Sequence, residues 1–289
     1  MKTLRLWSAC LALTACVNTN TASRTAPAEA PASVKLYAID CGYVQLGDAG
    51  MMADDGSLKG VSNEGIVPCY LIRHSKGDLL WDSGLSESIA DMPGGLRPQG
   101  QPIRFEMKKK LTASLGELGL APADVEFVSF SHLHFDHAGN ANLFAGSTWL
   151  VDAEERDAAF SEQAVQRGEV PHYSALEHAK TVRIEGDAPY DVFGDGAVTI
   201  HQAPGHTPGH TVLLVKTAKS GAVLLTGDLW PLPQSRERQL VPVYNFNREQ
   251  TLESMKRVEA LARDSNARVI REHVPEDFAA LPAFPAPLE

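Results

Sequence analysis

The chain has 289 residues, of which 44% are hydrophobic and 21% are charged, as in an ordinary soluble globular protein that buries a sizeable core. Its formal net charge is -10 at pH 7. An acidic chain lacks the basic surface on which phosphate binding depends, so nucleic acid is excluded as an expected partner.

The first fifteen residues have the pattern of a bacterial export signal. Lys2 and Arg5 precede an apolar run, residues 6–15, that is too short to span a bilayer. The run leads into a Leu-Thr-Ala-Cys sequence ending at Cys16, which resembles the lipobox of bacterial lipoproteins. We therefore expect an exported, periplasmic lipoprotein with a signal peptide over residues 1–15 and a membrane anchor at Cys16. The alternative is an ordinary signal peptide with Cys16 incidental.

A flexible tether is predicted over residues 16–33, because this stretch is rich in Ala, Thr, Asn and Pro and has no core-forming pattern. The folded domain is predicted over residues 34–289. It contains Cys41 and Cys69, each beside a predicted strand. Export permits a disulfide between them, but two cysteines do not establish pairing, so a disulfide and two buried thiols both remain open.

Alternating apolar residues and turn signals predict the first half of the domain. Strands are expected at residues 34–39, 66–73, 78–81, 125–130 and 148–151, with helices at 104–120 and 153–166. The strands at 66–73 and 78–81 form a hairpin. A long loop over residues 47–65 contains Met51 and Met52, and long loops in compact domains are commonly functional or disordered.

The second half repeats the pattern of strands followed by a helix. Extended structure is expected at residues 181–193, 197–201, 211–216, 222–226 and 267–271, and a second long loop at 229–246. Asn247 is placed to cap a helix, with Gln250 as its capping-box partner. Because no linker separates the two groups of strands, we expect one two-sheet sandwich with helices outside and a site where strand-ending loops converge.

Ligand-type side chains are concentrated directly after the predicted strand at 125–130. His132, His134, Asp136 and His137 fall within six residues. On an extended chain, residues two apart point the same way, so His132 and His134 can bind one ion from one side. Imidazole and carboxylate suit zinc and related transition metals. The alternative, solvated loop histidines, does not account for this spacing, so we predict a metal site.

Further donors follow later strands. His206 comes after a rigid Pro-Gly turn, Asp228 ends an apolar strand, and His273 ends the last predicted strand. Each alone is compatible with a structural role, but together they complete a set large enough for two ions. Asp82, after the strand at 78–81, is either an acid near the metals or a turn residue. His210 lies in the same Gly- and Pro-rich turn as His206, where its side chain can also be fixed.

The order of these donors resembles that of the metallo-β-lactamase superfamily, and within it the N-acyl-homoserine lactonases, which are quorum-quenching enzymes. The likeness extends over nearly the whole domain. It includes the segments 68–72, 82–84, 131–139, 205–210 and 223–228. It implies an α/β protein with a four-layer αββα sandwich and a dinuclear metal site at one edge of the two sheets.

By position, the resemblance implies one metal held by His132, His134 and His206. It implies a second metal held by Asp136, His137 and His273, with Asp228 bridging both. The expected cofactors are two divalent ions, with zinc favoured and iron, cobalt or manganese accepted by the same donors.

The implied reaction is hydrolysis of the lactone ring of an N-acyl-homoserine lactone, a small-molecule cyclic ester, by a hydroxide held between two metals. Asp136 or Asp228 would pass a proton to the leaving alkoxide. Many lactonases of this type carry a tyrosine three residues after the bridging aspartate, whereas this chain has Pro231 there. Lactone hydrolysis is compatible with this change because the metals can polarise the carbonyl.

An apolar pocket for the acyl chain is predicted from residues of the two long loops and the metal motif: Met51, Met52, Phe135, Trp230 and Leu232. The alternative is that these residues pack the loops or the interface of a homodimer, since related lactonases are often dimers. Rival functions are hydrolysis of an organophosphate triester, a thioester or a β-lactam on the same scaffold, and metal binding without catalysis by an exported lipoprotein.

Overall fold

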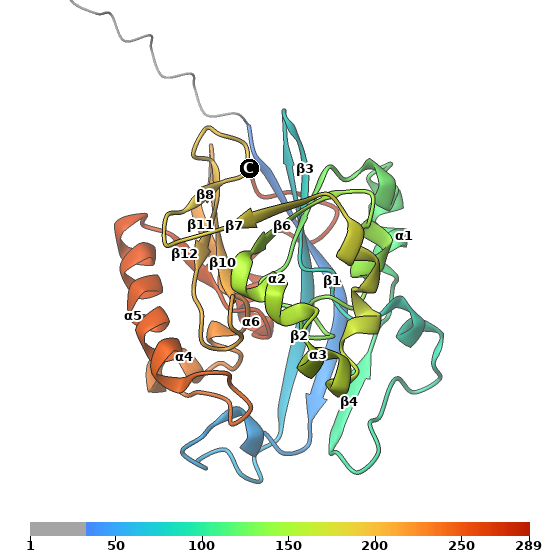
Figure 1. The fold of residues 1–289 in the computed structure, drawn as a ribbon, viewed down its shortest axis with the longest axis vertical. Coiled ribbons are helices and arrows are strands. Elements are labelled where there is room, and N and C mark those ends of the chain that lie inside the picture. The colour runs from blue at the N-terminus through green and yellow to red at the C-terminus, as the bar shows by residue number, and fades with distance from the viewer. Residues whose placement is uncertain (1–32) are drawn as a thin grey trace, which may run out of the picture. The chain divides into compact units, whose positions relative to one another are not determined.

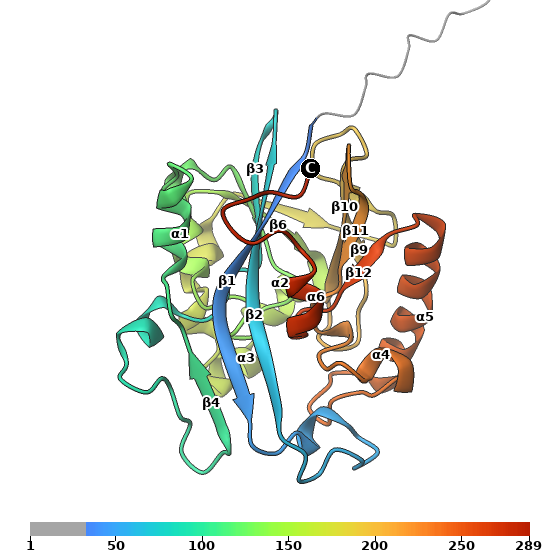
Figure 2. The same ribbon diagram turned by 180° about the vertical axis from the view of Figure 1, so that it is seen from behind.

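Two β-sheets face each other in the middle of the molecule (Figures 1 and 2). The computed structural model describes residues 33–289, so the predicted signal peptide, nearly all of the tether and Cys16 lie outside the described residues. The larger sheet has the strand order β4-β1-β2-β3-β5-β6-β7, and the smaller has the order β12-β11-β10-β9-β8. Within the described part, no helix is long and apolar enough to span a membrane.

The strands of the larger sheet are β1 (Lys35–Leu46), β2 (Asn63–His74), β3 (Gly77–Trp81), β4 (Ile103–Glu106), β5 (Phe127–Ser129), β6 (Thr148–Asp152) and β7 (Thr181–Ile184). Those of the smaller sheet are β8 (Tyr190–Asp191), β9 (Val198–Gln202), β10 (Thr211–Thr217), β11 (Gly221–Leu225) and β12 (Arg268–Ile270). Both predicted hairpins, β2–β3 and β10–β11, are present as antiparallel pairs.

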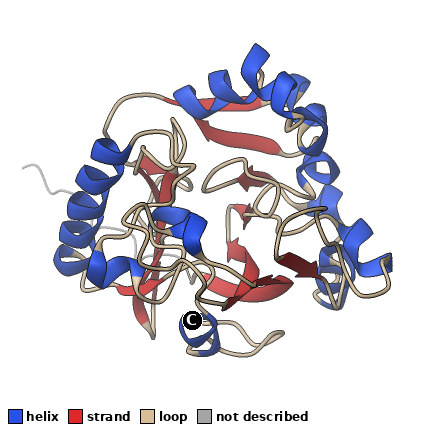
Figure 3. Cartoon of the chain, turned by 90° about the horizontal axis from the view of Figure 1, so that it is seen from below, coloured by secondary structure: helices blue, strands red, loops and turns tan. Residues whose placement is uncertain are grey.

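Helices cover the outer face of each sheet, which gives four layers (Figure 3). The smaller sheet is covered by α5 (Arg248–Asp264), and the larger by α1 (Leu111–Glu117) and α2 (Ala153–Ala159). The remaining α-helices of the described residues are α3 (Glu162–Arg167), α4 (Ser235–Arg238) and α6 (Pro275–Ala279), and short 3₁₀ helices lie in several of the connecting segments. The predicted αββα sandwich is confirmed.

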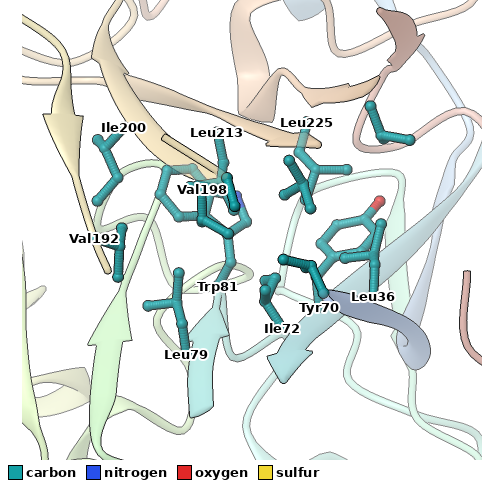
Figure 4. Close-up of a cluster of buried hydrophobic side chains, with 14 of the residues drawn as sticks. Leu36, Tyr70, Ile72, Leu79, Trp81, Val192, Val198, Ile200, Leu213 and Leu225 are labelled. Carbon is teal, nitrogen blue, oxygen red and sulfur yellow. The ribbon is translucent and has the colours of Figure 1, made fainter. Parts of the chain in front are cut away.

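The core between the sheets follows from the two-residue period of the strands. In β2, Tyr70 and Ile72 point into the space between the sheets, whereas Leu71 points to the helices outside. Leu213 and Val215 of β10 face them from the other sheet, as Figure 4 shows for several of these residues. Both sheets therefore bury both faces, and the ligand-type side chains predicted in the sequence lie after strand ends, in the connecting segments.

The helix predicted over residues 104–120 is wrong in its first part. Residues Ile103–Glu106 form β4, which pairs antiparallel with β1, and the helix begins only at Leu111. Phe105 points into an apolar cluster, so the local pattern is also that of a half-buried strand. Pairing with a distant strand decides the outcome, and that pairing is invisible in the local sequence.

Two other helix predictions differ in outcome. The helix expected over residues 153–166 is divided, because Ser161 caps a new helix, α3, with its hydroxyl accepting from the Ala164 N–H. The Asn247 cap of α5 is confirmed, since Asn247 Oδ1 accepts from Gln250 N at 3.0 Å. The capping box is not, because Gln250 Oε1 makes no hydrogen bond back to Asn247. Side-chain capping thus explains both a helix start that was predicted and one that was not.

The two cysteines of the domain are joined. Cys41 and Cys69 form a disulfide across β1 and β2, where the register of the pair shifts between Asp40 and Tyr43. The alternative of two buried thiols is therefore wrong. The bond joins β1 to β2 against Gly84, in the loop that follows β3.

Candidate metal centre

The strand pairing brings the predicted donors to one edge of the sandwich. In the smaller sheet β11 runs parallel to β12 with Leu225 beside Ile270, so Asp228 and His273, each three residues further on, leave the sheet side by side. In the larger sheet β3 runs parallel to β5. Asp82 therefore lies next to the start of the motif that carries His132.

The motif itself is a loop, not a strand. Because β5 ends at Ser129, the extended chain expected to align His132 with His134 is absent. Hydrogen bonds to buried carboxylates hold the loop instead: Ser131 N donates to Asp82 Oδ1 at 2.7 Å, and Leu133 N donates to Glu155 Oε1 at 3.0 Å. The two imidazoles converge, but for a reason other than strand geometry.

The first group of donors consists of three imidazoles. His132 Nε2 lies 2.8 Å from His134 Nδ1, and His206 Nε2 lies 3.2 Å from the same atom. The second group consists of Asp136, His137 and His273, with His273 Nε2 3.8 Å from Asp136 Oδ2. All three residues of the first group come from two loops that follow β5 and β9.

Asp228 stands between the two groups. Its Oδ2 lies 3.4 Å from His206 Nε2, whereas its Oδ1 lies 3.0 Å from His273 Nε2 and 3.4 Å from His137 Nε2. One carboxylate oxygen thus faces each group, which is the arrangement of a bridging ligand. We call these seven residues the ligand cluster: His132, His134, Asp136, His137, His206, Asp228 and His273.

The outer nitrogens of the imidazoles are occupied. His206 Nδ1 lies 3.0 Å from Asn245 Oδ1, and His273 Nδ1 lies 2.8 Å from the carbonyl oxygen of Ile66. His137 Nδ1 lies 3.2 Å from Asp82 Oδ2. A carbonyl or carboxylate oxygen there accepts the ring N–H, which leaves a lone pair on the inner nitrogen. This is how histidines that bind metals are oriented.

Glycines give two of these ligands the space they need. Gly205 and Gly227 directly precede His206 and Asp228, and both have a positive φ, +129° and +49°. A Cβ at Gly227 would collide with Ser131 and His210, and one at Gly205 would collide with Thr251. The close packing of three loops therefore depends on these two positions.

The charges within the ligand cluster depend on one another. Burial lowers the pKa of His132 and of His206 well below the ordinary value. Burial also opposes a charge on His273, but the adjacent Asp228 outweighs it and raises the pKa of His273 to about 9. Burial opposes the Asp228 charge in turn, yet His273 and His137 hold the pKa of Asp228 well below its usual range. This buried carboxylate requires positive charge beside it.

The residues behind the cluster also have defined positions. His210 uses both ring nitrogens, since Nε2 accepts from Asp228 N at 3.1 Å and Nδ1 donates to the carbonyl of Ala203 at 3.1 Å. It is unable to bind a metal in this position. Asp82, for which an acid near the metals and a turn residue both remained open, is buried against Ser131 and His137. It also adopts a left-handed backbone with φ +56°. His74, His172, His178 and His201 lie outside the ligand cluster.

A cavity of about 380 Å³ opens beside the ligand cluster. Asp136, Asp228 and His273 line one end of it. The rest of its wall is mostly apolar and includes Val44, Leu46, Met51, Met52, Ile103, Phe105, Phe135 and Leu232. We call it the apolar cavity. Four of the five residues predicted for an acyl pocket, Met51, Met52, Phe135 and Leu232, therefore line it.

Trp230 does not line the apolar cavity, which corrects its predicted place. It is buried in the cluster beneath α5, with the Arg236 guanidinium 5.3 Å from its ring. The chain turns after Asp228 so that Trp230 packs inward, while Pro231 and Leu232 face the cavity. Sequence alone does not separate an aromatic residue that fills a core from one that lines a cavity.

Several residues of the site were missed in the sequence. Val44, Ile103 and Phe105 line the apolar cavity from β1 and β4, and the misassigned strand at Ile103–Glu106 is the reason that two of them were overlooked. Tyr244 lies beside the ligand cluster, with its ring centroid 6.0 Å from that of His134. Its position in the long loop at 229–246 was the only signal available.

Comparison with known proteins agrees with this geometry. The family model described as "Metallo-beta-lactamase superfamily" matches residues 62–273. The N-acyl homoserine lactonase AttM of Azorhizobium caulinodans is 30% identical over 261 residues, which are 87% of this chain and 96% of that protein. The N-acyl homoserine lactonase AiiA of Bacillus thuringiensis subsp. kurstaki is 32% identical over 223 residues, 76% of this chain and 85% of that protein.

A solved structure of an N-acyl homoserine lactone hydrolase, with the product N-hexanoyl-L-homoserine bound at its catalytic metal center, superposes with a TM-score of 0.75. It is 30% identical, and the match covers 90% of this chain and 100% of that one. The dizinc lactonase AidC, at 16% identity and a TM-score of 0.62, shares the fold. This chain belongs to the metallo-β-lactamase superfamily, in the family of the N-acyl homoserine lactonases.

Proposed function

We propose that this protein is a dinuclear metal hydrolase that opens the lactone ring of N-acyl homoserine lactones and so quenches quorum signals. The observation that carries the proposal is the position of Asp228, with one oxygen toward each group of donors, at the end of an apolar cavity. The relatives named as lactonases, matched over most of the chain, support the choice of substrate.

The donor set fits two divalent cations. His137 Nε2 and Asp228 Oδ1 are buried and make no hydrogen bond of acceptable geometry, which is costly unless a cation compensates. His132, His134 and His206 would hold one ion, and Asp136, His137 and His273 the other, with Asp228 shared. Imidazole nitrogens mixed with carboxylate oxygens favour zinc, and also accept iron, cobalt or manganese.

When bound, such ions act as Lewis acids toward a carbonyl oxygen and lower the pKa of water toward neutrality. The protein's own groups do the rest. Asp136 lines the apolar cavity at its metal end. As a carboxylate it can take a proton and pass it to the alkoxide that leaves when the ring C–O bond breaks. Asp228 is the second candidate for this proton transfer.

The apolar cavity would bind the acyl chain. Its wall at Met51, Met52, Phe135 and Leu232 excludes water and gains affinity with each methylene that is buried, about 0.8 kcal/mol per CH₂. The two methionines are flexible enough to follow chains of different length. The scissile ester then lies at the end of the cavity where Asp136, Asp228 and His273 meet.

The test is turnover by the mature protein purified with its metal retained. A mid-chain N-acyl homoserine lactone, an aryl phosphotriester, a thioester and a penicillin are incubated separately and followed by mass spectrometry, each with a chelated control. We expect fast, chelator-sensitive opening of the lactone, with a mass gain of one water. Hydrolysis of another substrate with the lactone intact, or tight metal binding without turnover of any ester, would overturn the proposal.

We also propose that the protein is exported and lipid-anchored through Cys16. The supporting observation is the Leu-Thr-Ala-Cys sequence after a short apolar run. Expression in a Gram-negative host should yield a membrane-associated protein that becomes soluble on Cys16→Ser substitution. The homodimer remains a prediction, which sedimentation of the mature protein tests.

A further inference from the structure

One polar side chain stands between the ligand cluster and the apolar cavity. The ring of Tyr244 lies with its centroid 6.0 Å from that of His134 and 5.8 Å from that of His206. Tyr244 also lines the apolar cavity together with Asp136 and Asp228. An ester bound in this cavity against the metals would therefore lie near the phenol group of Tyr244.

The backbone on both sides of Tyr244 is held in place. Val243 N donates to the carbonyl of Met51 at 2.9 Å, which ties the segment to the cavity wall. Phe246 N donates to the carbonyl of His206 at 3.1 Å, and the Asn245 side chain meets the His206 ring at 3.0 Å. The backbone at Tyr244 is thus held between His206 and the loop that lines the cavity, which restricts where the ring can lie.

The hydroxyl of Tyr244 has only a weak partner. It donates to the thioether sulfur of Met52 at 3.4 Å, and a thioether is a poor acceptor. Among the described residues that line the apolar cavity, Tyr244 is the only one with a hydroxyl group, and Pro231 nearby offers no polar side-chain atom. If the Tyr244 hydroxyl donated to a substrate carbonyl oxygen in place of the Met52 sulfur, it would exchange a weak hydrogen bond for a stronger one.

On these contacts, and resting on the proposed lactonase function, we propose that Tyr244 is a catalytic residue that donates its phenol O–H to the carbonyl oxygen of the scissile ester. Negative charge develops on that oxygen when the carbonyl carbon is attacked. A hydrogen-bond donor that reaches this oxygen stabilises the transition state more than the ground state, because the charge on the oxygen grows. The proton stays on Tyr244 throughout, so the group acts by hydrogen bonding alone.

The experiment compares Tyr244→Phe, which removes only the hydroxyl, with Tyr190→Phe, a matched change at a half-buried tyrosine in β8 remote from the cavity. Both variants and the unaltered holoenzyme are assayed on N-hexanoyl homoserine lactone. We expect Tyr244→Phe to lower kcat by about 10- to 100-fold with KM within about twofold. Bound metal and Tm should match the unaltered protein, and Tyr190→Phe should turn over normally.

Three results would overturn the inference. The first is a Tyr244→Phe variant that retains kcat, and the second is a loss no greater than that of Tyr190→Phe. The third is a loss of kcat accompanied by a loss of metal, which would make the hydroxyl structural. The unaltered enzyme separates this inference from the function on which it rests. If the unaltered enzyme does not open the lactone, the proposed function and the role of Tyr244 are both overturned. If the unaltered enzyme and Tyr244→Phe both turn over normally, only the role of Tyr244 is overturned.

Discussion

The ligand cluster and the apolar cavity adjoin each other, yet the residues that form them agree with the sequence prediction to different degrees. All seven residues expected at the metals converge at one edge of the sandwich. The cavity wall, in contrast, includes Phe105 and excludes Trp230. Histidines and aspartates at the ends of buried strands are conspicuous because their burial is costly without a partner. Apolar side chains look the same in a core and in a cavity.

The largest expected effect is at Asp228, where the ligand cluster would lose its shared charge. Asp228→Asn keeps the shape but removes the negative charge that faces both groups of donors, so we expect fewer than two bound ions and a kcat/KM about 1000-fold lower. Metal analysis and the lactone assay measure this.

The matched control is Asp264→Asn, at an exposed position near the end of α5. It should retain both metal and activity. Full metal content and activity in Asp228→Asn would show that Asp228 does not bridge two ions.

The next effect concerns the support of the cluster. The Glu155 carboxylate accepts Leu133 N and Gly209 N, each at 3.0 Å, and so connects the loop of His132 to the loop of His206. In Glu155→Gln the amide NH₂ is a donor that faces one of these N–H donors, so one of the two hydrogen bonds is lost and the loops that carry the ligands are held less firmly. We expect metal affinity to fall about 10- to 100-fold as a result. Titration against a chelator of known affinity measures it. The exposed neighbour Glu154→Gln should bind normally, and equal affinities in the two variants would remove Glu155 from the site.

The smallest expected effect distinguishes an aromatic residue that lines the apolar cavity from one that packs in the core. Phe135 lines the apolar cavity and meets Phe105 edge to face at 5.0 Å, so Phe135→Ala should raise KM for an N-decanoyl lactone about 10-fold and leave an N-butanoyl lactone nearly unchanged. Trp230→Phe should keep the acyl-chain preference but lower the free energy of unfolding by about 1–3 kcal/mol. A change of preference in Trp230→Phe, with none in Phe135→Ala, would reverse our assignment of the two aromatic residues.

Local rules predicted those parts of the fold that local interactions determine. The β10–β11 hairpin and the Asn247 cap of α5 each depend on neighbouring residues, and both were expected. The strand β4 depends on pairing with β1, and the division of residues 153–166 into two helices depends on a cap at Ser161 inside an otherwise helical pattern. Such outcomes are decided by tertiary contacts and single side-chain hydrogen bonds.

The site shows the same limit. The side chains of the motif converge as expected, although the supposed strand through His132 and His134 is a loop. The hydrogen bonds of Ser131 and Leu133 to distant carboxylates set its shape. Tyr244 has no motif around it. Its place beside His134 arises only when the loop at 229–246 folds over the cluster.

The most direct test of the account is a crystal structure of the mature protein grown with zinc, with diffraction recorded on both sides of the zinc absorption edge. We predict two anomalous peaks, one among His132, His134 and His206 and the other among Asp136, His137 and His273, with Asp228 between them. A single peak, or a peak between the buried carboxylates of Asp82 and Glu272 instead, would contradict the dinuclear centre on which the proposed function depends.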